Sequence, residues 1–117
     1  MRNDRENIIV NKTFEFALHI IEFSESLYKI NKYSLANQIF KSGTSIGANV
    51  REAQNAESKA DFIHKIKIAA KEADETEYWL LLCLQSEYLN SPDEKLLSSL
   101  KEIILIINKI ISTSKFK

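Results

Sequence analysis

Residues that form turns or crosslinks are scarce in this chain of 117 residues. It contains two glycines, one proline and one cysteine, where average usage would give roughly eight glycines and six prolines. This shortage excludes collagen-like and linker-rich chains and most turn-rich all-β folds. The single cysteine, Cys83, leaves no intrachain disulfide and no zinc site built from cysteines. Its position inside an apolar run is typical of a small buried hydrophobe.

An excess of charge of one sign is also missing. Sixteen Lys and Arg residues balance sixteen Asp and Glu residues, which excludes a strongly basic coat for nucleic acid but allows a local basic patch. The longest apolar runs, residues 78–84 and 103–107, fall far short of the roughly 20 residues that cross a bilayer. No apolar stretch long enough for a secretory signal follows the charged N-terminal residues, so we expect no such signal. We therefore expect a soluble cytoplasmic protein without a membrane contact.

Apolar residues recur at helical spacing along most of the sequence, and no segment has the two-residue alternation of a strand. Helix starts are indicated by Ser34, by Ser58 with Asp61 three residues later, and by Ser91 before Pro92. The predicted helices cover residues of about 8–30, 35–57, 59–89 and 92–112. Short connections favour antiparallel neighbours. The sequence thus predicts one all-α domain over residues 1–117, an antiparallel up-down-up-down four-helix bundle.

Both glycines, Gly43 and Gly47, fall inside the second predicted helix, four residues apart on one face. Each costs about 1 kcal/mol relative to alanine in a helix. The pair could break the helix or could allow a neighbouring backbone to approach closely. We favour the close approach, because the apolar period continues across both positions.

The third and fourth predicted helices contain more apolar surface than a single bundle can cover. Residues 78–84 and 103–107 place apolar side chains in every direction, and a helix that is apolar all round must be covered on more than one side. We therefore expect self-association through the second halves of these helices. The predicted interface residues are Tyr78, Trp79, Leu82, Leu105 and Ile106.

Sequence patterns of catalysis and of metal binding are missing. No Gly-x-Ser-x-Gly turn exists, and the segment Lys41–Gly47 lacks the Gly-Lys-Ser/Thr ending of a phosphate-binding loop. The chain has two histidines and no Glu-x-x-His motif, so a di-iron site in the bundle is not expected. We predict a protein that is not an enzyme and that has no catalytic residue, no cofactor and no metal.

Charge is unevenly distributed along the third predicted helix, which is basic in its first half and acidic in its second. His64, Lys67 and Lys71 share one face through their spacing. Such a row can be a solvated surface, a set of phosphate contacts, or a partner for an acidic segment of another helix or subunit. If the protein binds RNA, the expected contacts are Arg51, Lys59, Lys65, Lys67 and Lys71.

Polar side chains form a second pattern on the predicted second helix. Ser45, Asn49 and Glu52 are spaced four and three residues apart, beside apolar positions that face a neighbour. Buried polar groups must be hydrogen-bonded, and Glu75 and Arg51 are the candidate partners. This network either fixes the register of the helices or forms a binding site near the end of the bundle.

Three stretches, Gln38–Ala53, Ser58–Lys65 and Lys71–Leu80, resemble the signature of a bacterial family called four helix bundle protein or 23S ribosomal RNA intervening-sequence protein. The resemblance implies an antiparallel four-helix bundle that assembles into a ring-like homopentamer. A related branch, the accessory variability protein of diversity-generating retroelements, binds nucleic acid and a reverse transcriptase. Proteins of that branch are strongly basic, whereas this chain is neutral.

Two functions follow as hypotheses. The first is a non-enzymatic, oligomeric interaction scaffold that associates with ribosomal or other structured RNA. The alternative is a protein–protein interaction module, with a reverse transcriptase or another protein as partner and without contact to nucleic acid.

Overall fold

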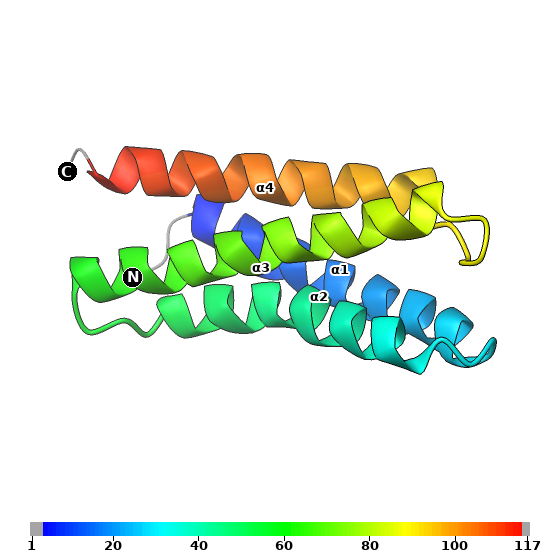
Figure 1. Cartoon of the computed structure of the whole chain (residues 1–117). Coiled ribbons are helices and arrows are strands. Elements are labelled where there is room, and N and C mark those ends of the chain that lie inside the picture. Colours follow the sequence, from blue (N-terminus) through cyan, green and yellow to red (C-terminus); the bar gives the residue numbers. More distant parts are fainter. Residues whose placement is uncertain (1–3, 116–117) are drawn as a thin grey trace.

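Four helices make up the computed structural model, which describes the backbone of residues 4–115 and the side chains of residues 8–114. They are α1 (Asp4–Tyr28), α2 (Tyr33–Ala53), α3 (Lys59–Gln85) and α4 (Glu94–Lys115), and no strand occurs among these residues. Each helix packs on the next, and α4 returns to α1, while the diagonal pairs do not approach one another. The predicted antiparallel four-helix bundle is therefore confirmed, as a rod of 47 × 20 × 19 Å (Figure 1).

The start of α3 agrees with the capping pattern of the sequence. Ser58 Oγ accepts a hydrogen bond from the Asp61 backbone N–H at 3.0 Å, and the Asp61 carboxylate accepts one from the Glu57 backbone N–H at 3.2 Å. This is a variant of the capping box, in which aspartate takes the place of glutamate and accepts from the N–H of the residue before the cap. The predicted beginning of this helix at residue 59 is confirmed.

Two of the other predicted caps are wrong. The helix α2 begins at Tyr33 without any side-chain cap, so Ser34 lies inside the helix. Asp93, and not Ser91, caps α4, because its Oδ1 accepts a hydrogen bond from the Leu96 backbone N–H at 2.7 Å. Pro92 therefore precedes the helix instead of opening it.

Every other predicted helix end differs from the observed one by two to four residues. The first helix begins at residue 4 and ends at residue 28, the second ends at residue 53, the third at residue 85, and the fourth runs over 94–115. The end of α1 has a local cause. Asn31 adopts the left-handed conformation, with φ of 64°, and the Lys32 N–H donates to the Leu27 carbonyl at 3.0 Å, which terminates the helix.

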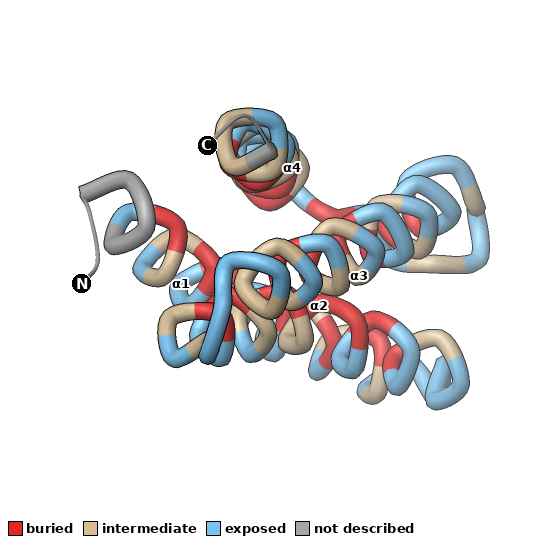
Figure 2. Tube along the Cα trace, turned by 90° about the vertical axis from the view of Figure 1, so that its left-hand side faces the viewer, coloured by how far each residue is buried: buried red, intermediate tan, exposed pale blue. Residues whose placement is uncertain are grey.

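The buried faces of all four helices turn toward one interior (Figure 2). The largest fully buried side chains are Phe16, Ile9, Ile20, Leu27, Ile39, Ile46, Ile66, Leu80, Leu100, Ile103, Ile107 and Val50. Packing is not uniform around the bundle, because α2 lies close to α1 and α3, whereas α4 is packed less closely, least of all on α1. Within residues 4–115, none of the helices combines the length and the apolarity that a bilayer crossing requires.

The two glycines explain the close packing of α1 on α2. A Cβ atom on Gly43 would lie 2.7 Å from Ile20 Cγ2, and one on Gly47 would lie 3.3 Å from the backbone carbonyl carbon of Thr13. A side chain at Gly43 would force Ile20 to shift, whereas one at Gly47 would make a tight contact with Thr13. The prediction that this pair permits a close approach, and does not break the helix, is confirmed.

Candidate interaction surfaces

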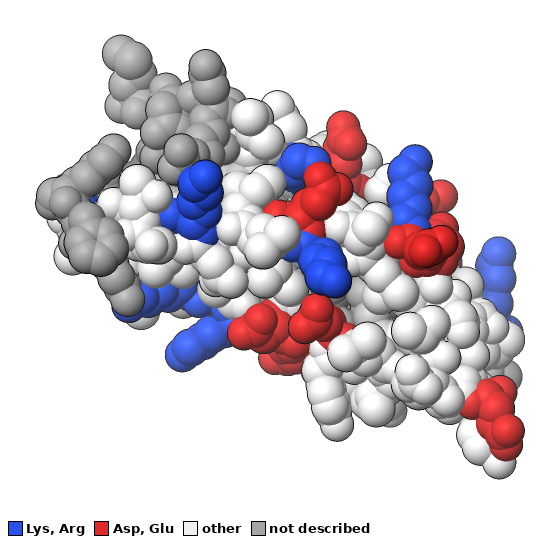
Figure 3. All heavy atoms as spheres, turned by 90° about the horizontal axis from the view of Figure 1, so that it is seen from above, with Lys and Arg blue, Asp and Glu red and all other residues white. Residues whose placement is uncertain are grey.

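The outward face of α3 has three successive regions of different chemical character along the helix. It begins with an exposed basic row, continues with two exposed carboxylates, and ends with exposed apolar side chains. Figure 3 shows the same order, blue then red then white, along its lower edge. The members in chain order are His64, Lys67, Lys71, Asp74, Glu75, Tyr78, Leu81 and Leu82. A protein of zero net charge thus carries separate basic and acidic surfaces.

The basic row borders a groove at the end of the bundle where α3 begins and α4 ends. This groove has a volume of about 430 Å³ and is lined by Lys59, His64 and Lys67 from α3 and by Ser114 from α4. Lys71 follows one helical turn after Lys67 and is exposed. Three of the five basic residues expected to contact RNA therefore lie along one side of the rod.

The other two predicted contacts lie elsewhere. Lys65 Nζ is 3.0 Å from Glu52 Oε1, so this cation forms an ion pair that joins α3 to α2. Arg51 lines a separate groove of about 220 Å³ between α1 and α2. The structure consequently does not bring all five residues into one patch.

The predicted polar stripe makes several local contacts. Ser45 Oγ donates to the Lys41 carbonyl at 2.6 Å, and Asn49 Nδ2 donates to the Ser45 carbonyl at 2.9 Å. Glu52 pairs with a lysine of α3, as described above, and Glu75 accepts a hydrogen bond from Trp79 Nε1 at 3.2 Å. No side-chain bond among the described residues connects the stripe to Glu75 or to Arg51.

The predicted oligomer contacts divide into exposed and packed side chains. Tyr78 is 57% exposed, Leu82 is 39% exposed and Leu105 is 66% exposed. Trp79 and Ile106 are half-buried and pack against the core. Tyr78 also makes an edge-on contact with Trp79, with the ring centroids 5.2 Å apart. Three of the five residues therefore remain available to another molecule, and two contribute to the bundle itself.

A second apolar surface on α1 and α2 was not predicted. Phe14 is 58% exposed and Leu18 is 51% exposed, and Ile21 on the same helix and Phe40 on α2 are also exposed. Of these side chains, Phe14 lines the groove that contains Arg51. The unusually broad apolar stripe of the first helix, too wide for one core-facing side, was the signal that could have located this surface.

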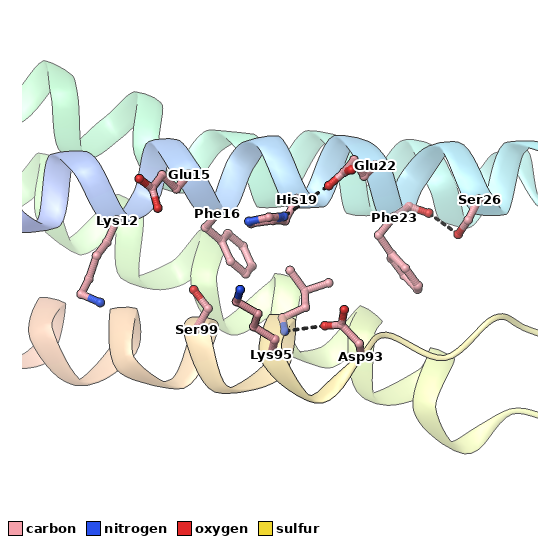
Figure 4. A pocket seen from close by; sticks show the side chains of 11 residues that line it. Lys12, Glu15, Phe16, His19, Glu22, Phe23, Ser26, Asp93, Lys95 and Ser99 are labelled. Atoms are coloured by element: carbon pink, nitrogen blue, oxygen red, sulfur yellow. Dashed lines mark hydrogen bonds and ion pairs between the residues drawn. The ribbon is translucent and has the colours of Figure 1, made fainter.

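A groove of about 590 Å³ separates α1 from the start of α4. Phe16, Phe23 and Leu96 supply its apolar surface, while Glu15, His19, Glu22, Asp93 and Lys95 are among its polar lining (Figure 4). His19 Nδ1 lies 3.3 Å from Glu22 Oε1, and Lys12 bridges the two helices by an ion pair with Glu102 at 3.3 Å. No group of three or more His, Cys, Asp or Glu side chains in the described part of the chain is placed to hold a metal ion.

Burial determines the titration of two side chains on α3. Desolvation raises the pKa of the Glu72 carboxyl, with a further increase from Glu75 and an opposing effect of Lys41. Because the folded-state pKa of Glu72 lies above its ordinary value, this residue stabilises the fold less as the pH rises through that pKa. Desolvation also raises the pKa of the Cys83 thiol to about 11.

Cys83 should be unreactive in the folded protein. At pH 8, a thiol with a pKa of about 11 is only about one part in a thousand thiolate, the reactive form. We expect a chromogenic aromatic disulfide to react at least about 100-fold more slowly with the native protein than with the protein in concentrated urea. Absorbance at pH 8 measures both rates, and equal rates would show that the thiol is open to solvent.

Comparison with known proteins identifies the family. Residues 5–109 match the family described as 23S rRNA-intervening sequence protein. A crystal structure of a protein of unknown function from the S23 ribosomal protein family of Bacteroides thetaiotaomicron is 43% identical, with a TM-score of 0.86. That match covers 92% of this chain and 98% of the other. No curated protein matches the chain. The extent of both matches, together with the shared four-helix fold, places this chain in the 23S rRNA-intervening sequence protein family.

Proposed function

We propose that this protein is a non-catalytic, homo-oligomeric scaffold of the cytoplasm that binds structured RNA through the basic row of α3. The observation that carries this proposal is the row itself. His64, Lys67 and Lys71 are exposed on one face of α3, and none of the three forms an ion pair with another described residue. The charge of the two lysines is therefore available to an external anion.

The chemistry of the row favours contacts to phosphates over contacts to bases. Lysines act as point charges toward phosphate oxygens, which position a protein on nucleic acid without reading its sequence. Aromatic side chains, which would stack on unpaired bases, are absent from this part of the outward face of α3. A folded RNA helix, recognised by shape and by its phosphates, is the ligand that fits this surface.

Self-association would increase the affinity of such a weakly charged site. Each copy offers only a few lysines, but several copies in one assembly contact several phosphates of the same RNA, and linked sites gain affinity without new contacts. A ring of five copies, as the family resemblance implies, would repeat the basic row five times. The exposed apolar side chains of α1, α2, α3 and α4 are the surfaces from which such an assembly can form.

The test is the salt dependence of binding to a duplex RNA hairpin of about 20 base pairs, a length close to what shape-specific RNA-binding domains span. The double variant Lys67→Gln and Lys71→Gln should bind more weakly, and the slope of log K against log salt should fall by roughly two. The matched control is Lys29→Gln with Lys32→Gln. These two lysines are also exposed but lie at the opposite end of the rod, so the control slope should equal that of the wild type.

An unchanged slope in the first variant would remove the basic row as the phosphate contact. If the wild-type protein of known oligomer mass binds no RNA at low salt, the RNA proposal is wrong altogether. The exposed apolar surfaces would then favour the alternative, a scaffold for protein partners.

A further inference from the structure

An exposed ridge runs along α4 on the side opposite the core. It consists of Lys101, Leu105 and Lys109, which are spaced by four residues and are all exposed, while the core-facing side of the same helix carries Ile103 and Ile107. Leu105 is the only large hydrophobic side chain of this ridge. Neither lysine forms an ion pair within the described residues. A leucine between two uncompensated cations has no role in the packing of the bundle.

A ridge with the same spacing and the opposite charge runs along α3. It consists of Asp74, Tyr78 and Leu82, again four residues apart and exposed, with the Glu75 carboxylate beside Asp74. Both ridges point away from the interior, so they cannot meet within one chain. Ridges spaced by four residues interdigitate when two helices pack in the arrangement that is commonest in globular proteins.

We propose that the α3 ridge of one copy packs against the α4 ridge of a second copy. This inference depends on the proposed self-association, and it does not depend on RNA. In this contact Leu105 packs between Tyr78 and Leu82 of the other copy, which removes the most exposed leucine of the bundle from water. A lysine of the α4 ridge then lies next to the carboxylates of Asp74 and Glu75.

Charge selects this pairing over the two pairings of like ridges. Two α3 ridges that meet in parallel would bring four carboxylates together, with only Lys71 of each copy nearby as a cation, and two α4 ridges would bring four lysines together. Like charges across an interface cost several kcal/mol, whereas complementary charges fix partner and register. The two ridges are different surfaces of one molecule, so each copy can bind one neighbour through its α3 ridge and another through its α4 ridge. This contact therefore allows an assembly of more than two copies.

Charge reversal tests the pairing. The α4 variant carries Lys101→Glu with Lys109→Glu, and the α3 variant carries Asp74→Lys with Glu75→Lys. Each should weaken self-association at least about tenfold, the effect of roughly 1.4 kcal/mol. Combining all four substitutions in one chain restores the charge complementarity and should restore the wild-type mass. Sedimentation over a range of concentrations measures the mass, and circular dichroism confirms that each variant is still helical.

The control variant, Lys29→Glu with Lys32→Glu, makes the same change of charge at exposed sites outside both ridges and should leave the mass unchanged. If both ridge variants keep the wild-type mass, or if the combined variant does not regain it, the pairing of these ridges is wrong while self-association stands. A wild-type protein that is monomeric throughout would overturn the pairing together with the proposed assembly. RNA binding is measured separately, with the Lys67 and Lys71 variant.

Discussion

Shortening Leu80 to alanine is expected to lower the free energy of unfolding by roughly 2–5 kcal/mol. Leu80 is fully buried in the second half of α3, and it belongs to the continuous core formed by all four helices. The substitution removes apolar surface that folding takes out of water and leaves a cavity that its neighbours fill only in part. Since a domain of this kind has a stability of about 5–15 kcal/mol, the loss is a large fraction of the total.

Urea denaturation followed by circular dichroism measures this loss. The neighbouring residue, Leu81, supplies a matched control, because it is 46% exposed and has the same side chain on the same helix. Leu81→Ala should change the free energy of unfolding far less than Leu80→Ala, within about 0.5–1 kcal/mol of the wild type. An equal loss of unfolding free energy in the two variants would mean that Leu81 is buried as well as Leu80. This would occur if another copy of the protein covered Leu81 under the conditions of the unfolding experiment.

Replacing Gly43 with valine should destabilise the protein by about 2–3 kcal/mol, although valine is the better helix former. The Cβ atom alone would lie 2.7 Å from Cγ2 of Ile20, and Ile20 is fully buried and cannot turn away. Helix α1 must then move off α2, which opens gaps in a densely packed interior. Steric overlap therefore outweighs the propensity gain of a few tenths of a kcal/mol.

The matched control is Ala48→Val, which introduces the same side chain into the same helix at an exposed position. Its effect on the free energy of unfolding should stay within about 0.5 kcal/mol. Thermal or urea unfolding of the two variants side by side gives the comparison. A Gly43→Val variant as stable as the Ala48→Val variant would show that α1 and α2 can separate without cost.

The fold was predictable because helical periodicity, the scarcity of glycine and proline and the lack of strand patterns all indicate one architecture. The helix ends were less predictable, since several residues near each end could serve as caps. Asp93 and Ser91 are both good N-cap residues, and only the backbone geometry shows that Asp93 accepts the hydrogen bond of Leu96. Likewise, Asn31 ends α1 through a left-handed conformation, which its residue type permits but does not require.

The candidate surfaces were predictable only in part. Spacing along α3 identified the row of His64, Lys67 and Lys71, because a helix brings residues three and seven apart onto one face. Spacing could not show that Lys65 pairs with Glu52, since that contact depends on how two helices are placed side by side. It also could not decide which side of an entirely apolar segment faces the core, so it did not show that Trp79 and Ile106, which we expect at the oligomer interface, also pack against the core.

The order of charges along α3 separates a basic first half from an acidic patch further along the same outward face. The isoelectric point of about 6.7 reports only the balance of all charges and not this separation. In solution, the same asymmetry turns an approaching polyanion toward the end where α3 begins before any contact is made. Separated charges on a neutral protein therefore orient an approaching polyanion more than they attract it.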